Sequence, residues 1–189
     1  MPYRKTELKA GEYYHIYNRG HNFQPVFFEY ENYAYFLRQF RKYFWPVDAD
    51  VIAYCLMPNH YHLLVHLKTD RFSEIMQAFS LSYSKSINKR FERVGSLFQG
   101  RFKSVHVDRN EYLLHLSRYI HLNPVKANLV SRAEDWEFSS YQEFTGLRNG
   151  TLPKPEIVLS QFPTREYYRA FVESHIENDN KIIQHLIMD

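Results

Sequence analysis

The segment 51–66 constrains the fold more than any other part of the sequence. Two runs rich in β-branched and aromatic residues, VIAYCLM (51–57) and HYHLLVH (60–66), are separated only by Pro58 and Asn59. A two-residue connection between such runs joins antiparallel neighbours. The segment therefore predicts a β-hairpin, and with it an antiparallel sheet.

The flanking segments supply the remaining elements. We expect strands at 12–20 and 101–107, where aromatic and β-branched residues gather. We expect helices at 32–44, 71–94 and 110–123, where apolar residues recur at helical spacing; the last should end at Pro124. The order β-α-β-β-α-β plus a helix indicates an α+β fold of ferredoxin-like or RRM-like type. Two helices would cover one face of the sheet and leave the other available for a site.

The C-terminal part has a weaker pattern. Gly and Pro interrupt the chain beyond residue 145, and 164–189 is expected to form one or two acidic helices. We therefore predict a main domain at 1–147 and a helical extension at 148–189 that packs on it. With 189 residues and 44% hydrophobic content, one core is the expected outcome.

Composition narrows the environment and the partners. The N-terminal 20 residues contain no apolar run, and no stretch approaches the roughly 20 apolar residues that span a membrane, so we expect a cytoplasmic protein without a membrane partner. The only cysteine, Cys55, is expected to be a buried apolar residue. Residues 71–132 carry 11 Lys and Arg against 4 Asp and Glu, whereas 133–189 carry 5 against 10. The basic middle suits a polyanion, although a solvated helix face explains it too.

The second strand of the hairpin places histidines on one face. Alternate side chains of a strand share a face, so His60, His62 and His66 point one way, and the apolar residues between them point toward the helices. Two imidazoles one residue apart can bind a divalent ion and leave coordination positions open. Surface or hydrogen-bonded histidines would give the same pattern. On the neighbouring strand, His15 is expected to be structural, with a position behind the metal site as the alternative.

A second motif lies in the helix predicted at 110–123. Tyr119 and Asn123 are four residues apart and therefore stack on one face. A metal ligand at Asn123 would place the Tyr119 phenol beside the same ion, where it could attack a phosphate. A packing tyrosine and a helix cap would explain the same two residues.

Together these motifs occur in an order that resembles a known family. The chain is similar to single-tyrosine HUH transposases of the IS200/IS605 type, and within them to REP-associated tyrosine transposases. The resemblance covers roughly residues 10–147 and rests on five blocks: YYHIYNRG (13–20), AYCLMPNHYHLLV (53–65), LFQGRFKSVHVD (97–108), YLLHLSRYIHLNPVKANLV (112–130) and WEFSSYQEFTG (136–146).

The resemblance implies a mechanism and assigns roles to residues. It implies an HUH endonuclease fold, in which a catalytic helix is added to the ferredoxin-like sheet and residues 1–147 form the catalytic domain. His60 and His62 would hold Mg²⁺ or Mn²⁺ against a phosphate of single-stranded DNA, and Tyr119 would form a covalent 5′-phosphotyrosine. Asn123 stands where related enzymes often carry Gln. Because Asn is one methylene shorter, it would ligate the ion from a closer helix or act through water.

The resemblance also implies the partners. The expected partner is single-stranded DNA that carries a hairpin formed by a palindromic repeat. The chain would act as a homodimer, like minimal enzymes that exchange tyrosine helices, or as a monomer. The candidate DNA contacts are basic residues, for which a plain solvated charge is the equal alternative: Arg4, Lys5, Arg19, Arg101, Lys103, Arg118 and Lys126.

Two other functions remain open at this point. One is a catalytically idle, RRM-like protein that binds single-stranded nucleic acid by aromatic stacking. The other is a metal-dependent phosphodiesterase that uses water as its nucleophile, with Tyr119 in a structural role. They differ from the transferase in the products that they predict from hairpin DNA.

Overall fold

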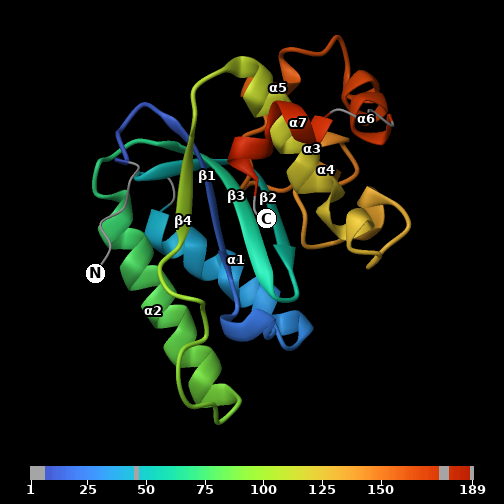
Figure 1. Ribbon diagram of the computed structural model, residues 1–189. Helices are drawn as coiled ribbons and strands as arrows, with labels where there is room; N and C mark the ends of the chain where they lie inside the picture. The colour runs from blue at the N-terminus through green and yellow to red at the C-terminus, as the bar shows by residue number, and fades with distance from the viewer. Residues whose placement is uncertain (1–6, 45–46, 175–178, 188–189) are drawn as a thin grey trace.

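One antiparallel sheet organises the molecule. The computed structural model describes residues 7–44, 47–174 and 179–187. Within them the sheet has the strand order β2-β3-β1-β4, formed by β1 (Tyr13–Arg19), β2 (Ala49–Met57), β3 (His60–Leu67) and β4 (Lys103–Val107) (Figure 1). α1 (Tyr30–Phe44) connects β1 to β2, and α2 (Phe72–Arg90) connects β3 to β4. The predicted ferredoxin-like arrangement and the hairpin at Pro58-Asn59 are confirmed.

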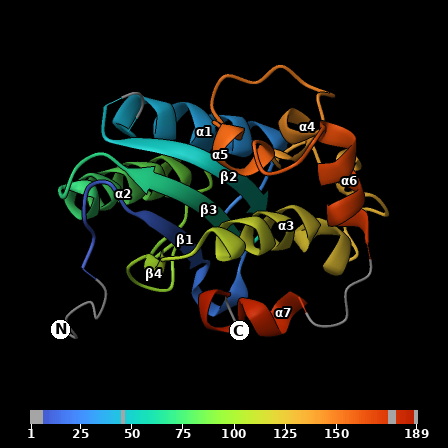
Figure 2. The same ribbon diagram turned by 90° about the horizontal axis from the view of Figure 1, so that it is seen from above.

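α1 and α2 cover one face of this sheet (Figure 2). Each helix buries large side chains three or four residues apart, which forms a single apolar stripe. From β3, Tyr61, Leu63 and Val65 enter the same core, so the predicted alternation of β3 is confirmed. The buried apolar residues of the two helices are Tyr33, Phe36, Phe40 and Phe44 of α1, and Phe72, Met76, Phe79, Tyr83 and Ile87 of α2.

The opposite face is covered by α3 (Asn110–Lys126) and by the C-terminal elements. These are α4 (Tyr141–Phe144), α5 (Glu156–Leu159), α6 (Arg165–Glu173), α7 (Asp179–Ile182) and the 3₁₀ turns η2 (Ala133–Asp135) and η3 (Gln184–Leu186); a further 3₁₀ turn, η1 (His21–Phe23), follows β1. α3 packs on the sheet through an apolar stripe that includes Leu116 and Ile120, and it buries Ser117 and His121 beside it. Because two adjoining stripes of α3 are buried, the helix lies between the sheet and the extension.

The end of α3 differs from the sequence expectation. The helix continues through Pro124 to Lys126, whereas we expected it to end at the proline. A proline in the last turn removes only one N–H donor. The turns that follow are closed by hydrogen bonds from Ala127 N to Asn123 O and from Leu129 N to Pro124 O, each 2.9 Å. The predicted boundary was therefore wrong by three residues.

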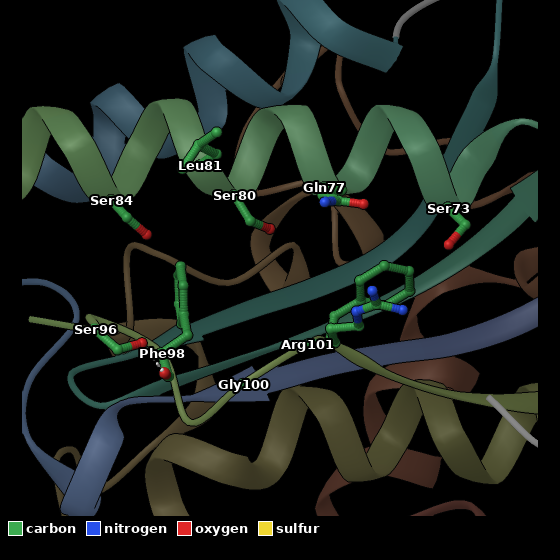
Figure 3. Close-up of a pocket in the computed structure, with 10 residues that line it drawn as sticks. Ser73, Gln77, Ser80, Leu81, Ser84, Ser96, Phe98, Gly100 and Arg101 are labelled. Carbon is green, nitrogen blue, oxygen red and sulfur yellow. Dashed lines mark hydrogen bonds between the residues drawn. The ribbon is translucent and has the colours of Figure 1, made fainter. Parts of the chain in front are cut away.

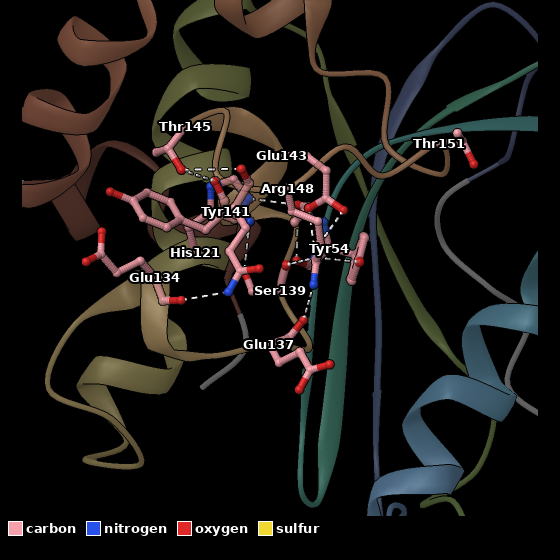
Figure 4. A network of polar contacts seen from close by, with 12 residues as sticks. Tyr54, His121, Glu134, Glu137, Ser139, Tyr141, Glu143, Thr145, Arg148 and Thr151 are labelled. Atoms are coloured by element: carbon pink, nitrogen blue, oxygen red, sulfur yellow. Dashed lines mark hydrogen bonds and ion pairs between the residues drawn. The ribbon is translucent and has the colours of Figure 1, made fainter.

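The segment after α3 is fastened to the edge strand β2. Backbone bonds of 2.9 Å run from Leu56 N to Phe138 O and from Ser140 N to Tyr54 O. The Arg148 guanidinium donates hydrogen bonds to the side chains of Glu143 and Tyr54 and to the backbone carbonyl groups of Glu137 and Ser139 (Figure 4). Further along, Lys154 N donates to Val51 O at 2.7 Å. These bonds hold the segment after α3, together with the start of the extension at Arg148 and Lys154, against the sheet.

Two expectations from composition concern the described residues. Cys55 is fully buried, as predicted. None of the helices seen in residues 7–44, 47–174 and 179–187 combines the length and the apolar character needed to span a membrane.

Candidate metal and nucleophile site

His60 and His62 lie on the face of β3 that is turned away from α1 and α2. Their ring centroids are 5.0 Å apart. Arg19 and Tyr17 of β1 are their direct cross-strand partners, so these residues share the same face. The hairpin turn holds His60 as well, because Asn59 Oδ1 lies 2.6 Å from His60 Nδ1 and accepts its hydrogen.

Burial keeps both histidines neutral. His62 is fully buried, and desolvation together with the neighbouring His15 and His60 holds its pKa well below the usual 6.5. For the half-buried His60, desolvation lowers the pKa to about 4; a hydrogen bond with Asn123 opposes this shift and the charge of Arg19 adds to it. The neutral imidazole is the form that binds metals.

One atom of this pair is conspicuous. His62 Nε2 is buried and has no hydrogen-bond partner in the described part of the chain. The other ring nitrogen, Nδ1, lies 3.0 Å from His15 Nε2. A buried polar atom without a partner is costly unless it binds a ligand, so Nε2 has the position and chemistry of a metal-binding atom.

α3 brings Tyr119 and Asn123 to the histidines. The Tyr119 ring stands edge-on to His62, with centroids 5.4 Å apart. Asn123 Nδ2 donates to Tyr119 O at 2.9 Å, which leaves Oδ1 as its acceptor atom. Lys126 Nζ lies 5.4 Å from the centre of the Tyr119 ring. The structure thus brings together the predicted metal ligands His60, His62 and Asn123 and the predicted nucleophile Tyr119.

A buried polar network fixes the position of α3. His121 Nδ1 lies 2.7 Å from Tyr168 Oη of α6, and His121 Nε2 lies 2.8 Å from Ser140 Oγ. Tyr168 also donates to Ser117 Oγ at 3.1 Å. Because His121 points into this network, it faces away from Tyr119. The network ties the helix that carries the tyrosine to the extension.

The donor set fits a divalent ion that needs ligands beyond the protein. Within the described ranges, no three His, Cys, Asp or Glu side chains come close enough to hold an ion. Two imidazole nitrogens and one amide oxygen, from His60, His62 and Asn123, would leave positions for water or phosphate oxygens. The observation that favours this fit is that His62 Nε2 has no hydrogen-bond partner in the part of the chain that the structure describes.

The basic residues nominated as DNA contacts are dispersed. Arg19 and Lys103 lie on the histidine face, since Lys103 pairs with Tyr17 across β4 and β1, and the exposed Lys126 lies beside Tyr119. Arg118 is instead buried, where its Nε donates to Val172 O of α6 at 3.1 Å; we therefore leave it out of the DNA surface. Arg4 and Lys5 lie outside the described residues.

Arg101 lines a separate groove of about 290 Å³ between α2 and the segment before β4. Figure 3 shows a row of polar side chains on α2, including Ser73, Gln77 and Ser80, facing Phe98 and Arg101 across this groove. It lies on the α2 side of the sheet. Arg101 is thus separated from the group formed by Arg19, Lys103 and Lys126.

Two further neighbours of the site, His15 and Tyr17, lie on β1. His15 contacts His62 directly, which is the alternative to the structural role we expected. The Tyr17 ring lies 6.1 Å from the His62 ring and 4.8 Å from the His15 ring. The register of β1 against β3 sets Tyr17 directly opposite His62. Tyr17, unlike His15, was not predicted as a neighbour, although the two residues stand at alternate positions within YYHIYNRG.

Comparison with known proteins identifies the family. Residues 10–123 match the family described as "Transposase IS200 like". The chain is similar to a "Putative REP-associated tyrosine transposase" of Haemophilus influenzae, with 27% identity over 103 residues that cover 49% of this chain and 58% of that relative, less than two thirds of its length. It also shares its fold with a REP-associated tyrosine transposase solved bound to a REP hairpin, at a TM-score of 0.63 and 20% identity over 82% of this chain and 94% of that one. The chain therefore belongs to the family of IS200-like transposases and has their HUH endonuclease fold.

Proposed function

We propose that this protein is a metal-dependent endonuclease and strand transferase that acts on hairpin-bearing, single-stranded DNA of the REP type. One observation carries the proposal: Tyr119, from a separate helix, lies beside His62, whose buried Nε2 has no hydrogen-bond partner among the described residues. A pure nucleic-acid binder has no use for this combination. Residues 1–147 would form the catalytic domain, and 148–189 an extension packed on it.

The chain's own residues would divide the work as follows. His60, His62 and Asn123 would hold Mg²⁺ or Mn²⁺, which supplies positive charge at the non-bridging oxygens of the scissile phosphate. The Tyr119 oxygen would form a bond to phosphorus while the bond to the 3′ oxygen breaks. The phenolic proton passes through solvent to that 3′ oxygen. One strand end becomes a 3′-hydroxyl and the other a 5′-phosphate ester of Tyr119.

The substrate surface would lie beside this site. Arg19 and Lys103 share the histidine face, and Lys126 lies near the attacking ring, so they are suited to contact phosphates on either side of the scissile bond. Tyr119 lies beside His62 of its own chain, which supports cleavage in cis and is compatible with a monomer. A homodimer that exchanges α3 would instead place Tyr119 against the histidines of a second copy.

The test is covalent capture of DNA. Wild-type protein incubated with Mn²⁺ and a hairpin oligonucleotide carrying a single-stranded flank should yield a protein–DNA adduct on a denaturing gel. Tyr119→Phe should remove the adduct and the cleavage together. Tyr112→Phe is the matched control, because Tyr112 lies on the same helix but contacts His185 rather than the metal site.

The rival functions give different results. An idle binder would shift the hairpin on a native gel, and the wild type would form no adduct. A phosphodiesterase that uses water would cut the DNA without an adduct, and its cleavage would survive Tyr119→Phe. Either result would overturn the proposed strand transfer.

A further inference from the structure

His62 is backed by a chain of two buried hydrogen bonds that begins in the C-terminal extension. The backbone carbonyl of Leu186, in η3, contacts His15 Nδ1, and His15 Nε2 lies 3.0 Å from His62 Nδ1. Both imidazoles are fully buried, and their planes are inclined by only 24°. β1, β3 and η3, which are far apart in the sequence, therefore meet at His62 Nδ1 and the two groups behind it.

The chemistry of these groups sets the direction of both bonds. A carbonyl oxygen only accepts, so His15 Nδ1 must carry the hydrogen that points at Leu186. A neutral imidazole has one N–H, so His15 Nε2 is then an acceptor, and His62 Nδ1 must donate to it. The remaining nitrogen of His62, Nε2, is left with a bare lone pair. This is the atom that has no hydrogen-bond partner within residues 7–44, 47–174 and 179–187.

We propose that His15 is a positioning residue that holds His62 in the tautomer whose Nε2 lone pair faces the divalent ion. The proposal rests on the proposed function, because the ion is what the lone pair would bind. Metal-binding histidines commonly donate their other N–H to such a partner, which fixes the tautomer and the ring orientation. On the same strand, His60 has the same device, with Asn59 Oδ1 accepting from its Nδ1.

A packing role alone does not account for His15. Its cross-strand neighbours on this face are Leu64 and Val105, both apolar. Burying a polar ring among them costs free energy that an aliphatic or phenyl side chain would not. That cost is offset only when both ring nitrogens of His15 form hydrogen bonds, with Nδ1 donating to the Leu186 carbonyl and Nε2 accepting from His62 Nδ1. This arrangement fixes the tautomer of His62.

The decisive measurement is the tautomer of His62 in metal-free wild-type protein, read from long-range ¹H–¹⁵N correlations of the imidazole rings. We expect the proton on Nδ1. A proton on Nε2 would overturn the proposal without any variant, and the reading does not depend on whether the protein cleaves DNA. If the wild-type protein forms no adduct with DNA yet shows the expected tautomer, the proposed function fails, whereas the role of His15 in fixing the tautomer of His62 stands.

Variants of His15 provide the second arm, with Mn²⁺ affinity followed by electron paramagnetic resonance. His15→Phe preserves a buried ring but removes the acceptor, so Mn²⁺ affinity should fall by about 10- to 100-fold. His15→Gln can donate to Leu186 and accept from His62, and it should recover much of that loss. His66→Phe is the control, because His66 lies on the same face of β3 and packs on Tyr13. Equal Mn²⁺ affinity in His15→Phe and wild type would overturn the proposal.

Discussion

Replacing Arg148 with alanine should strongly destabilise the fold, because this residue joins the start of the extension to β2. Its guanidinium makes two bonds of 2.8 Å with the carboxylate of Glu143. It also donates at 2.7 Å to the carbonyl oxygens of Glu137 and Ser139. The Glu143 side chain is only 7% exposed, and that of Arg148 is 30% exposed. Removing the arginine would leave a buried carboxylate without its counter-charge.

The size of the effect follows from this burial. Removing one partner of a fully buried ion pair costs about 3 to 5 kcal/mol. Water can reach Glu143 through the space that Arg148 leaves, since Arg148 lies partly at the surface, so we expect about 2 to 4 kcal/mol. For a chain of this size that corresponds to a fall of roughly 5 to 15 °C in Tm. Urea unfolding should show a lower midpoint with an unchanged m-value.

Two further variants make the reasoning refutable. Arg71→Ala removes an ion pair with Glu74 whose side chains are 75% and 73% exposed, so it should change stability by less than about 1 kcal/mol. Adding Glu143→Gln to Arg148→Ala should recover at least half of the loss, because the uncompensated charge disappears. The argument fails if Arg148→Ala costs no more than Arg71→Ala, or if the double variant is the least stable of all.

Three other predictions test the site and its support. Burial lowers the pKa of His121 from 6.5 to about 3. Between these two values the unfolded chain binds a proton at His121 that the folded chain does not, so the free energy of unfolding should fall as the pH drops from 6.5 toward 3. His121→Phe should reduce the slope of this pH dependence by up to about 1.4 kcal/mol per pH unit. Urea titrations at several pH values would measure it. Arg19→Gln and Lys103→Gln should each reduce the slope of log affinity for single-stranded DNA against log salt concentration by about 0.7, as measured by fluorescence anisotropy. Arg71→Gln is the control. If the slope of the Arg19 or the Lys103 variant equals that of the control, the residue replaced in that variant does not belong to the proposed DNA surface. A methyl group at Gly20 would collide with the backbone carbonyl of Gln24, and Gly20 N donates to Asn59 O in the hairpin turn at 2.7 Å. Gly20→Ala should therefore lower the free energy of unfolding by about 1 to 3 kcal/mol and weaken adduct formation. A variant as stable as the wild type would contradict the packing described.

Much of the fold was predictable because its signals are local. The Pro58-Asn59 turn, the alternation of His60 and His62 with apolar neighbours, and the spacing of Tyr119 and Asn123 all follow from the periods of strands and helices. The boundary at Pro124 was wrong because a single missing N–H in a last turn is tolerated when later residues close the helix. Resemblance then supplied the roles that periodicity alone left open.

The sequence by itself therefore determined which side chains share a face, because that is settled by backbone geometry over a few residues. Only the tertiary structure decided which faces meet. It placed α3 between the sheet and the extension, buried Arg118 against α6, and set His15 and the Leu186 carbonyl behind His62. These contacts depend on strand register and on packing between residues up to 171 positions apart, and no local pattern records such distances.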